Sequence, residues 1–163
     1  MPATGPAEPR TEAAIPEQRE LTLVHGDYHL ANVVAAPGGE EIRAILDWEL
    51  CTLGDPLADL GGLLAYWPQE GDAVEGVFPA SRLPGFPSRT QLAEAYAAET
   101  GRDLGALPFW HALGLWKVAI ITEGVRRRAL ADERNAARTG IPPAQLVADL
   151  VLEAQTVAFA GGL

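Results

Sequence analysis

Two short apolar segments separated by a glycine-rich turn constrain the fold of this chain most strongly. NVVAA (32–36) and EIRAILDW (41–48) are rich in β-branched and apolar residues, and PGGE lies between them. The glycines can adopt the positive φ angles that tight turns between antiparallel strands require. We therefore predict a β-hairpin with Asn32 at the outer end of one strand and Asp47 at the outer end of the other. The pairing would bring these side chains close together. Residues 21–25 look like another short strand.

Most of the remaining sequence has the periodicity and the end signals of helices. Ser88 and Gln91 form a capping-box pattern, and Gly101 suits the C-terminal end of the same helix. Asp55 is predicted to cap an earlier helix that has Pro56 at its first position. The expected fold class is therefore α+β and mainly helical, with helical segments at 54–67, 88–101, 107–130 and 141–160.

Composition excludes several classes of protein. With 163 residues, of which 48% are hydrophobic and 21% charged, the chain can bury a core of its own. The net charge of −10 argues against nucleic-acid partners, because phosphate binding needs a basic face. No apolar run reaches the length of a membrane span without a charge, so no membrane association is expected.

The cysteine content and the N-terminal segment bear on location and domain organisation. The single cysteine, Cys51, excludes an internal disulfide and is expected to be a small core residue. A cytoplasmic location is the corresponding expectation. Residues 1–20 are rich in proline and lack the apolar region of a signal peptide, so we expect a disordered Pro-rich lead-in. One domain would then occupy residues 21–163.

Polar side chains interrupt the apolar segments at three points. Asp27 and Asn32 lie five residues apart with loop-like sequence between them, and Asp47 follows at the end of the hairpin. Two acids and an amide that converge form an oxygen-rich site, which Mg²⁺ prefers and usually completes with phosphate oxygens and water. Phosphoryl transfer needs this set, because metal ions neutralise phosphate charge while a carboxylate orients the attacking hydroxyl.

Three motifs in this part of the chain resemble those of one family. HGDYHLAN (25–32) matches the H-G-D-x-x-x-x-N catalytic loop of the aminoglycoside phosphotransferase and choline kinase superfamily, which has a protein-kinase-like fold. ILDWE (45–49) resembles the metal-binding segment of that family, and LGDPLADLG (53–61) resembles its following D-P-x-x-D-L segment. Within this family, the amino-acid sequence of these motifs most resembles a subgroup related to the kinase-like domain of acyl-CoA dehydrogenase family members 10 and 11. The resemblance is close over residues 21–64 and looser beyond.

The resemblance implies a role for each matching residue. Asp27 would be the catalytic aspartate that faces the substrate hydroxyl. Asn32 and Asp47 would hold Mg²⁺ against the phosphates of ATP or another nucleoside triphosphate. His25 would support the catalytic loop structurally, and Asp59 would hydrogen-bond its backbone from the next helix. The implied enzyme is an ATP- and Mg²⁺-dependent phosphotransferase, a kinase acting on a hydroxyl of an aminoglycoside-like or hydroxyacyl compound.

The resemblance also implies a second lobe. Kinase-like enzymes hold ATP between two lobes, and the N-terminal lobe carries a glycine-rich loop and a phosphate-contacting lysine. Only 24 residues precede His25, none of them forms G-x-G-x-x-G, and the single lysine is Lys117. We therefore expect the C-terminal lobe of a kinase-like fold with the N-terminal lobe absent, which leaves open whether this chain alone is active. The expected partners are a small-molecule substrate and either a complementing N-lobe chain or a second copy of this chain.

Two other hypotheses stay open at this point. The chain could be a non-catalytic binding or interaction module, or half of a split kinase, that keeps the metal-site residues. His25, Asp27 and His29 could also form an H-x-D-x-H site for Zn²⁺ or Fe²⁺, because alternate residues of a strand face one way. The loop-like sequence around Gly26 argues against a regular strand there. His111, in an apolar helical segment, is expected to be a hydrogen-bonded core residue.

Overall fold

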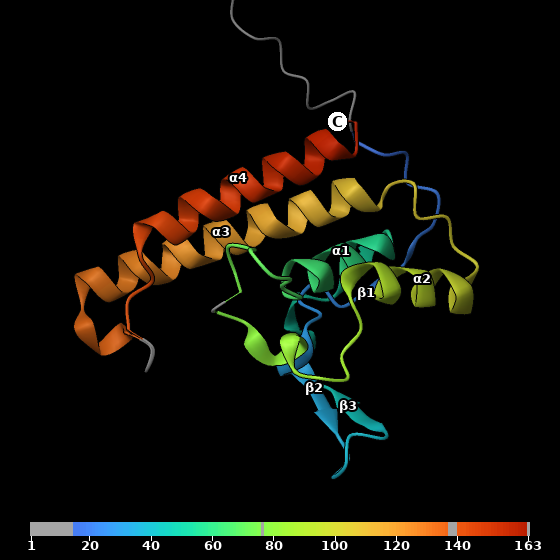
Figure 1. Cartoon of the computed structure of the whole chain (residues 1–163), viewed down its shortest axis with the longest axis horizontal. Helices are drawn as coiled ribbons and strands as arrows, with labels where there is room; N and C mark the ends of the chain where they lie inside the picture. The colour runs from blue at the N-terminus through green and yellow to red at the C-terminus, as the bar shows by residue number, and fades with distance from the viewer. Residues whose placement is uncertain (1–14, 76, 137–139, 163) are drawn as a thin grey trace, which may run out of the picture.

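The computed structural model describes residues 15–75, 77–136 and 140–162, and these form a mainly helical α+β fold (Figure 1). The first 14 residues of the predicted lead-in lie outside this described part. Within it there are four α-helices, namely α1 (Leu57–Ala65), α2 (Arg89–Thr100), α3 (Leu107–Ala131) and α4 (Ala144–Ala160). Four short 3-10 turns also occur in the described ranges, at η2 (Leu30–Asn32), η3 (Trp48–Leu50), η4 (Pro79–Arg82) and η5 (Glu133–Asn135).

The predicted β-hairpin is present and projects away from the long helices α3 and α4 (Figure 1). Strands β2 (Val33–Ala35) and β3 (Ile42–Ile45) pair in antiparallel fashion with Val33 opposite Ile45. Both glycines of the turn have positive φ angles, as the tight connection requires. In this register, Asn32 and Leu46 lie just beyond the last pair of the ladder, at the end opposite the turn.

A second strand pair connects the start of the described chain to the segment before α1. Strand β1 (Thr22–Val24) pairs with β4 (Thr52–Gly54) in antiparallel fashion. The sequence predicts β1 but not its partner, because the two strands are separated by the whole hairpin. The β1–β4 pair encloses the hairpin, so the loop after β1 and the loop after β3 arise close together.

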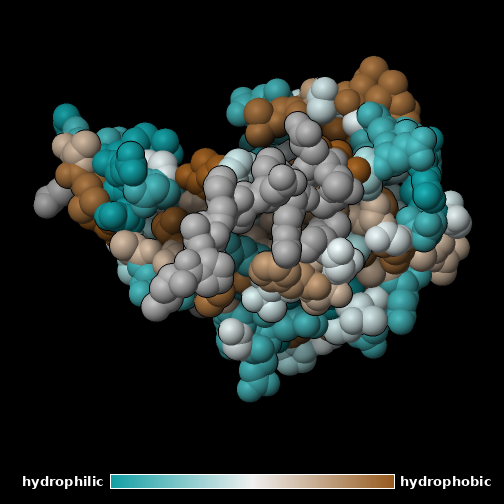
Figure 2. All heavy atoms as spheres, turned by 90° about the horizontal axis from the view of Figure 1, so that it is seen from above, coloured by the Kyte–Doolittle hydropathy of each residue, from teal (hydrophilic) through white to brown (hydrophobic). Residues whose placement is uncertain are grey.

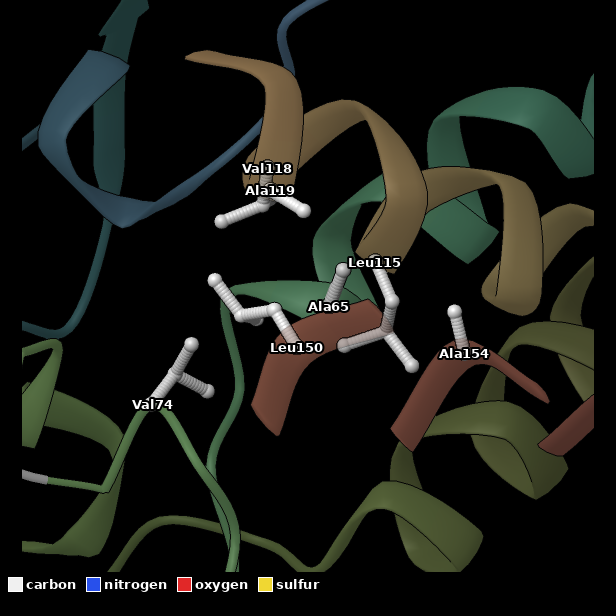
Figure 3. Close-up of a cluster of buried hydrophobic side chains, with 7 residues drawn as sticks. All are labelled: Ala65, Val74, Leu115, Val118, Ala119, Leu150 and Ala154. Atoms are coloured by element: carbon white, nitrogen blue, oxygen red, sulfur yellow. The ribbon is translucent and has the colours of Figure 1, made fainter. Parts of the chain in front are cut away.

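Helix α3 is the centre of the helical part and packs against both α1 and α4. Figure 1 shows α3 and α4 running side by side along most of their lengths. The main cluster of buried hydrophobic side chains joins these helices and the segment after α1 (Figure 3); its members are Ala65, Val74, Leu115, Val118, Ala119, Leu150 and Ala154. The central position predicted for residues 107–130 is confirmed, although α3 also exposes Trp116 and Ile120.

Two glycines allow α1 to approach α3 closely. A Cβ atom at Gly61 would lie 2.4 Å from the carbonyl carbon of Trp110, and one at Gly114 would lie 2.8 Å from the carbonyl oxygen of Gly61. Any larger residue would push the helices apart, so the crossing depends on glycine. The neighbouring Gly62 has no heavy atom within 4 Å of such a Cβ position. The close crossing fixes α1, and with it Asp59, relative to α3.

Arg89 at the start of α2 holds the loop of residues 68–87 against the helices. Its Nη2 lies 2.6 Å from Oδ2 of Asp72 in that loop. Glu153 on α4 lies 3.6 Å from the same nitrogen and also accepts a hydrogen bond from the Ala73 amide at 3.0 Å. The predicted loop is therefore joined to α2 and α4 by polar contacts that are largely shielded from solvent.

One sequence-based expectation about the core is wrong, and a second is met only in part. Cys51 is exposed, because the residue lies between η3 and the edge strand β4 and not in the helical core. His111 is buried, but its Nε2 has no hydrogen-bond partner among the described residues. Burial, followed by the nearby positive charge of Arg89, lowers the pKa of His111 to about 4.

The surface is a mixture of polar and apolar areas. On the face shown in Figure 2, hydrophobic areas interrupt the hydrophilic surface. Large hydrophobic side chains are exposed on the paired strands β1 and β4, including Leu23 at 62% and Leu53 at 63% exposure. In the part of the chain that the structure describes, no helix combines the length and the apolar character needed to cross a membrane.

Candidate active site

The loop that follows β1 is anchored by the imidazole of His25, which is only 2% exposed. Its Nε2 donates to the carbonyl oxygen of Leu46 at 2.7 Å, and its Nδ1 accepts from the Asp27 amide at 3.2 Å. Because a carbonyl can only accept, these partners assign the neutral ring with its proton on Nε2. His25 therefore ties the loop after β1 to the loop after β3.

The same contacts exclude the proposed H-x-D-x-H metal site. Both ring nitrogens of His25 face backbone groups, so neither is directed at a shared metal position with His29. In the described ranges, no group of three His, Cys, Asp or Glu side chains could hold a metal ion. The zinc or iron hypothesis is wrong, because the loop turns at Gly26 and does not continue as a strand.

Asp59 on α1 supports the loop from the helical side. Its Oδ2 accepts from the His25 amide at 2.6 Å and its Oδ1 accepts from the Gly26 amide at 2.9 Å. These are the backbone hydrogen bonds predicted for Asp59. Gly26 has a φ of +80°, and a Cβ there would lie 2.4 Å from the carbonyl oxygen of Leu50. Glycine is thus required where the loop passes the η3 turn.

The carboxylate of Asp27 is flanked on both oxygens. Its Oδ2 lies 3.3 Å from Nε2 of His29, and its Oδ1 lies 3.7 Å from Nζ of Lys117. The Nδ1 of His29 accepts from the Ala31 amide at 3.2 Å, so Nε2 is the nitrogen that can donate to Asp27. Burial, followed by the charge of Asp27, raises the pKa of the nearby Tyr66 to about 12. The Tyr66 hydroxyl therefore stays protonated at neutral pH.

Asn32 connects the loop after β1 to the end of the hairpin. Its side-chain Nδ2 donates to the backbone carbonyl of Asp27 at 2.9 Å, and its backbone carbonyl accepts from the Leu46 amide at 2.8 Å. With the side-chain NH₂ group used in this way, Oδ1 is the atom of Asn32 available as a metal ligand. One residue thus fixes the spacing between Asp27 and the segment that carries Asp47.

Asp47 adopts an unusual backbone conformation directly after that segment. Its φ and ψ angles of 65° and 56° are left-handed, and it is the only non-glycine residue with positive φ in the described part of the chain. Conformations of this kind concentrate at functional sites, where the surrounding structure maintains them. Asp47 is exposed and its carboxylate does not cap the η3 turn that follows.

Together, these contacts hold Asp27 and Asn32 next to each other, and Asp47 directly follows Leu46 at the same end of the hairpin. His25 and Asp59 support the backbone of the loop that carries Asp27. Because Asp47 is exposed, the site faces solvent on that side. The amide oxygen of Asn32 and the carboxylate of Asp47 are hard oxygen donors, which suits Mg²⁺ better than softer metals.

Sequence reasoning missed two neighbours of Asp27, namely Lys117 and Tyr66. Lys117 comes from α3, 90 residues after Asp27, and its approach to Asp27 depends on a helix crossing that sequence patterns do not reveal. The available signal was a single lysine in the apolar stretch LWKVAI. Tyr66 follows α1, and its ring packs against His29 with centroids 4.6 Å apart.

The chain is similar to known proteins of one family. The family model described as the phosphotransferase enzyme family, APH, matches residues 6–110. Acyl-CoA dehydrogenase family member 11 of Mus musculus is 39% identical over 122 residues, or 72% of this chain and 16% of that protein. Acyl-CoA dehydrogenase family member 10 of Mus musculus is 35% identical over 128 residues, or 76% of this chain and 12% of that protein. The chain therefore spans only a small part of the length of these relatives.

A solved structure shares the fold. The crystal structure of a "putative aminoglycoside phosphotransferase" from Ralstonia eutropha JMP134 matches with a TM-score of 0.57 and 27% identity, covering 86% of this chain and 41% of that chain. The resemblance recognised in the motifs, including the similarity to acyl-CoA dehydrogenase family members 10 and 11, is confirmed. Because the family model matches more than half of its length, the chain belongs to the phosphotransferase enzyme family, APH.

Proposed function

We propose that this chain is the catalytic part of an ATP- and Mg²⁺-dependent phosphotransferase that phosphorylates a hydroxyl of a small molecule. The observation that carries the proposal is the double connection made by Asn32. Its side chain donates to the backbone carbonyl of Asp27 at 2.9 Å, and its backbone carbonyl accepts from the amide of Leu46, the residue before Asp47, at 2.8 Å. Family membership supports a phosphotransferase activity in general.

Asn32 and Asp47 would hold the magnesium ion. Both present oxygen donors at the end of the hairpin, and two protein ligands are typical for a metal that keeps water and phosphate in its other positions. The ion would supply the positive charge that neutralises the nucleotide phosphates during transfer. The solvent-facing position of Asp47 leaves room for a nucleotide on that side of the site.

Asp27 would act on the acceptor hydroxyl. Its carboxylate would orient the hydroxyl and accept its proton while the hydroxyl oxygen bonds to the γ-phosphorus. The bond between the γ-phosphorus and the β–γ bridging oxygen breaks in the same step, and the nucleoside diphosphate leaves. His25 and Asp59 would keep Asp27 in place through the loop backbone. The His25 ring accepts from the Asp27 amide, and Asp59 accepts from the amides of His25 and Gly26.

We further propose that the chain corresponds to the C-terminal lobe of a kinase-like fold. The match to the Ralstonia structure covers 41% of that chain, so the larger part of that molecule has no counterpart here. A further lobe, from another segment, a complementing chain or a second copy of this chain, would cover the nucleotide. The exposed Leu23 and Leu53 on β1 and β4 offer apolar surface for such an association.

A hydroxyacyl compound is the favoured acceptor. The relatives described above are named as acyl-CoA dehydrogenase family members, which favours an acyl substrate for the part that they share with this chain. An aminoglycoside-like acceptor is the other candidate, because the structural neighbour is named for that class and the net charge of −10 suits a cation. The exposed apolar side chains on β1 and β4 also favour a second function, a non-catalytic interaction module.

Phosphate transfer measured with γ-labelled ATP and magnesium tests the proposal. The full chain would be assayed against hydroxyacyl and aminoglycoside acceptors, alone and mixed with the part of the Ralstonia protein that it does not match. We expect labelled product, and a decrease of roughly 100- to 10,000-fold in Asp27→Asn, since that variant loses its proton acceptor. Asp103→Asn, at a carboxylate that is 73% exposed, is the matched control and should retain full activity. A folded wild type that transfers no phosphate, either alone or mixed with the Ralstonia part, would support the interaction module instead.

A further inference from the structure

Lys117 is a charged side chain on α3, between the exposed Trp116 and the buried Val118. It is the only lysine in the sequence. Its neighbours Leu115 and Val118 are 0% and 3% exposed, whereas the Lys117 side chain is 41% exposed. Long basic side chains can lay their methylene groups along apolar surface while the ammonium group reaches a polar position. In this structure that position is the loop after β1.

The ammonium group of Lys117 completes the anchoring of the Gly26 residue. Its Nζ donates to the carbonyl oxygen of Gly26, while the Gly26 amide donates to Oδ1 of Asp59 at 2.9 Å. Lys117 on α3 therefore holds the loop through the Gly26 carbonyl, and Asp59 on α1 holds it through the Gly26 amide. Since Gly61 brings these two helices into close contact, the position of the loop depends on their crossing.

Lys117 also places a positive charge beside Asp27. Nζ lies 3.7 Å from Oδ1 of Asp27, and no other lysine or arginine in the described residues forms an ion pair with this carboxylate. In the proposed reaction, Asp27 must approach a transferring phosphoryl group that is itself negatively charged. A cation next to the carboxylate reduces that repulsion and keeps the proton acceptor oriented.

A simple surface ion pair would not account for these contacts. Exposed pairs with long side chains contribute little, because holding them in one geometry costs conformational entropy. Lys117 instead binds a backbone carbonyl in a loop whose other groups are fixed by His25 and Asp59. The residue before the predicted catalytic aspartate is thus restrained at both its amide and its carbonyl group.

We infer that Lys117 is a positioning residue of the candidate active site, which holds the Gly26 carbonyl and supplies the counter-charge to Asp27. The inference rests on the proposed phosphotransferase function. Lys117 acts through the loop and through Asp27, and no direct contact with the nucleotide or the acceptor is required of it.

The test compares Lys117→Met, which keeps the length of the side chain but removes the charge, with Lys117→Arg, which keeps the charge. We expect Lys117→Met to lower kcat roughly 10- to 100-fold, the cost of misplacing a catalytic group. The KM for ATP should change far less, since nucleotide binding depends on other residues. Lys117→Arg should recover part of the lost kcat. The matched control is Arg127→Met, which removes a 78% exposed positive charge from the same helix and should leave kcat unchanged.

Hydrogen exchange of the Gly26 and Asp27 amides, measured by NMR in the same proteins, reads the loop directly. Exchange should be faster in Lys117→Met than in wild type and Arg127→Met. Equal kcat and equal exchange in Lys117→Met and Arg127→Met would overturn the inference. A wild type that neither binds Mn²⁺ with ATP nor transfers phosphate would instead overturn the proposed function and with it the catalytic part of the inference. Exchange would then decide separately whether Lys117 holds the loop.

Discussion

The carboxylate of Asp59 accepts a hydrogen bond of 2.6 Å from the backbone amide of His25. The two residues are 34 positions apart, and the contact joins the first helix to the loop that carries the predicted catalytic aspartate. The second oxygen of Asp59 binds the next amide, that of Gly26, at 2.9 Å. A carboxylate that accepts two backbone bonds in a partly buried position is difficult to replace, because any substitute leaves an amide without a partner.

Asp59→Asn should therefore destabilise the chain. The amide side chain can accept from one backbone N–H but presents its own NH₂ group to the other, which leaves a buried donor unsatisfied. We expect a loss of about 1–3 kcal/mol in the free energy of unfolding, measured by urea denaturation. Glu94→Gln makes the same chemical change on the exposed surface of α2 and should alter this free energy by less than about 0.5 kcal/mol. Equal effects of the two substitutions would show that Asp59 does not support the loop.

Adjacent glycines in α1 give a second prediction. Gly61→Ala would place a Cβ 2.4 Å from the Trp110 carbonyl carbon, so α1 and α3 must separate. We expect a loss of about 1–3 kcal/mol or more, as for other overpacked sites. Gly62→Ala meets no atom within 4 Å and should stabilise the helix by about 0.5–1 kcal/mol. Thermal denaturation of both variants measures the difference, and a similar change in Tm for the two would contradict the close crossing.

The buried His111 predicts how stability depends on pH. Its pKa is about 4 in the folded chain, against an ordinary value of 6.5. Between these values the unfolded chain binds a proton that the folded chain does not, so the free energy of unfolding falls as the pH decreases from about 6.5 to 4. His111→Leu removes this contribution in a pocket that already contains leucines. The loss of stability between pH 7 and pH 4.5 should be about 2–3 kcal/mol smaller in the variant. Parallel stability curves for wild type and variant would count against a neutral, buried His111.

The local parts of the fold could be predicted from the sequence. The capping box of Ser88 and Gln91 is present, and Gly101 has the left-handed conformation expected at the end of α2. The hairpin followed from two apolar segments and a glycine turn. The start of α1 differs by one position, because the chain enters the helix at Leu57 while Asp55 accepts from the Leu57 amide at 2.9 Å. Cap signals locate helix ends only to within one or two residues.

The non-local parts could not be predicted in the same way. The pairing of β4 with β1 joins segments 30 residues apart, and periodicity does not encode the partner of a strand. The approach of Lys117 to Asp27 depends on how α3 crosses α1 at Gly61 and Gly114, which is a property of packing. The motifs therefore identified the candidate loop, while the tertiary structure identified what surrounds it.

Binding of Mn²⁺ in the presence of a non-hydrolysable ATP analogue, followed by electron paramagnetic resonance, tests the central claim most directly. Wild type should bind Mn²⁺ together with the nucleotide, and Asp47→Asn should weaken this binding by at least roughly 10-fold, since it alters one of two protein ligands. Glu49→Gln, an equivalent change at an exposed carboxylate two positions away, should leave binding unchanged. Equal binding by the two variants, or no binding by a folded wild type, would contradict a metal–nucleotide site at Asn32 and Asp47.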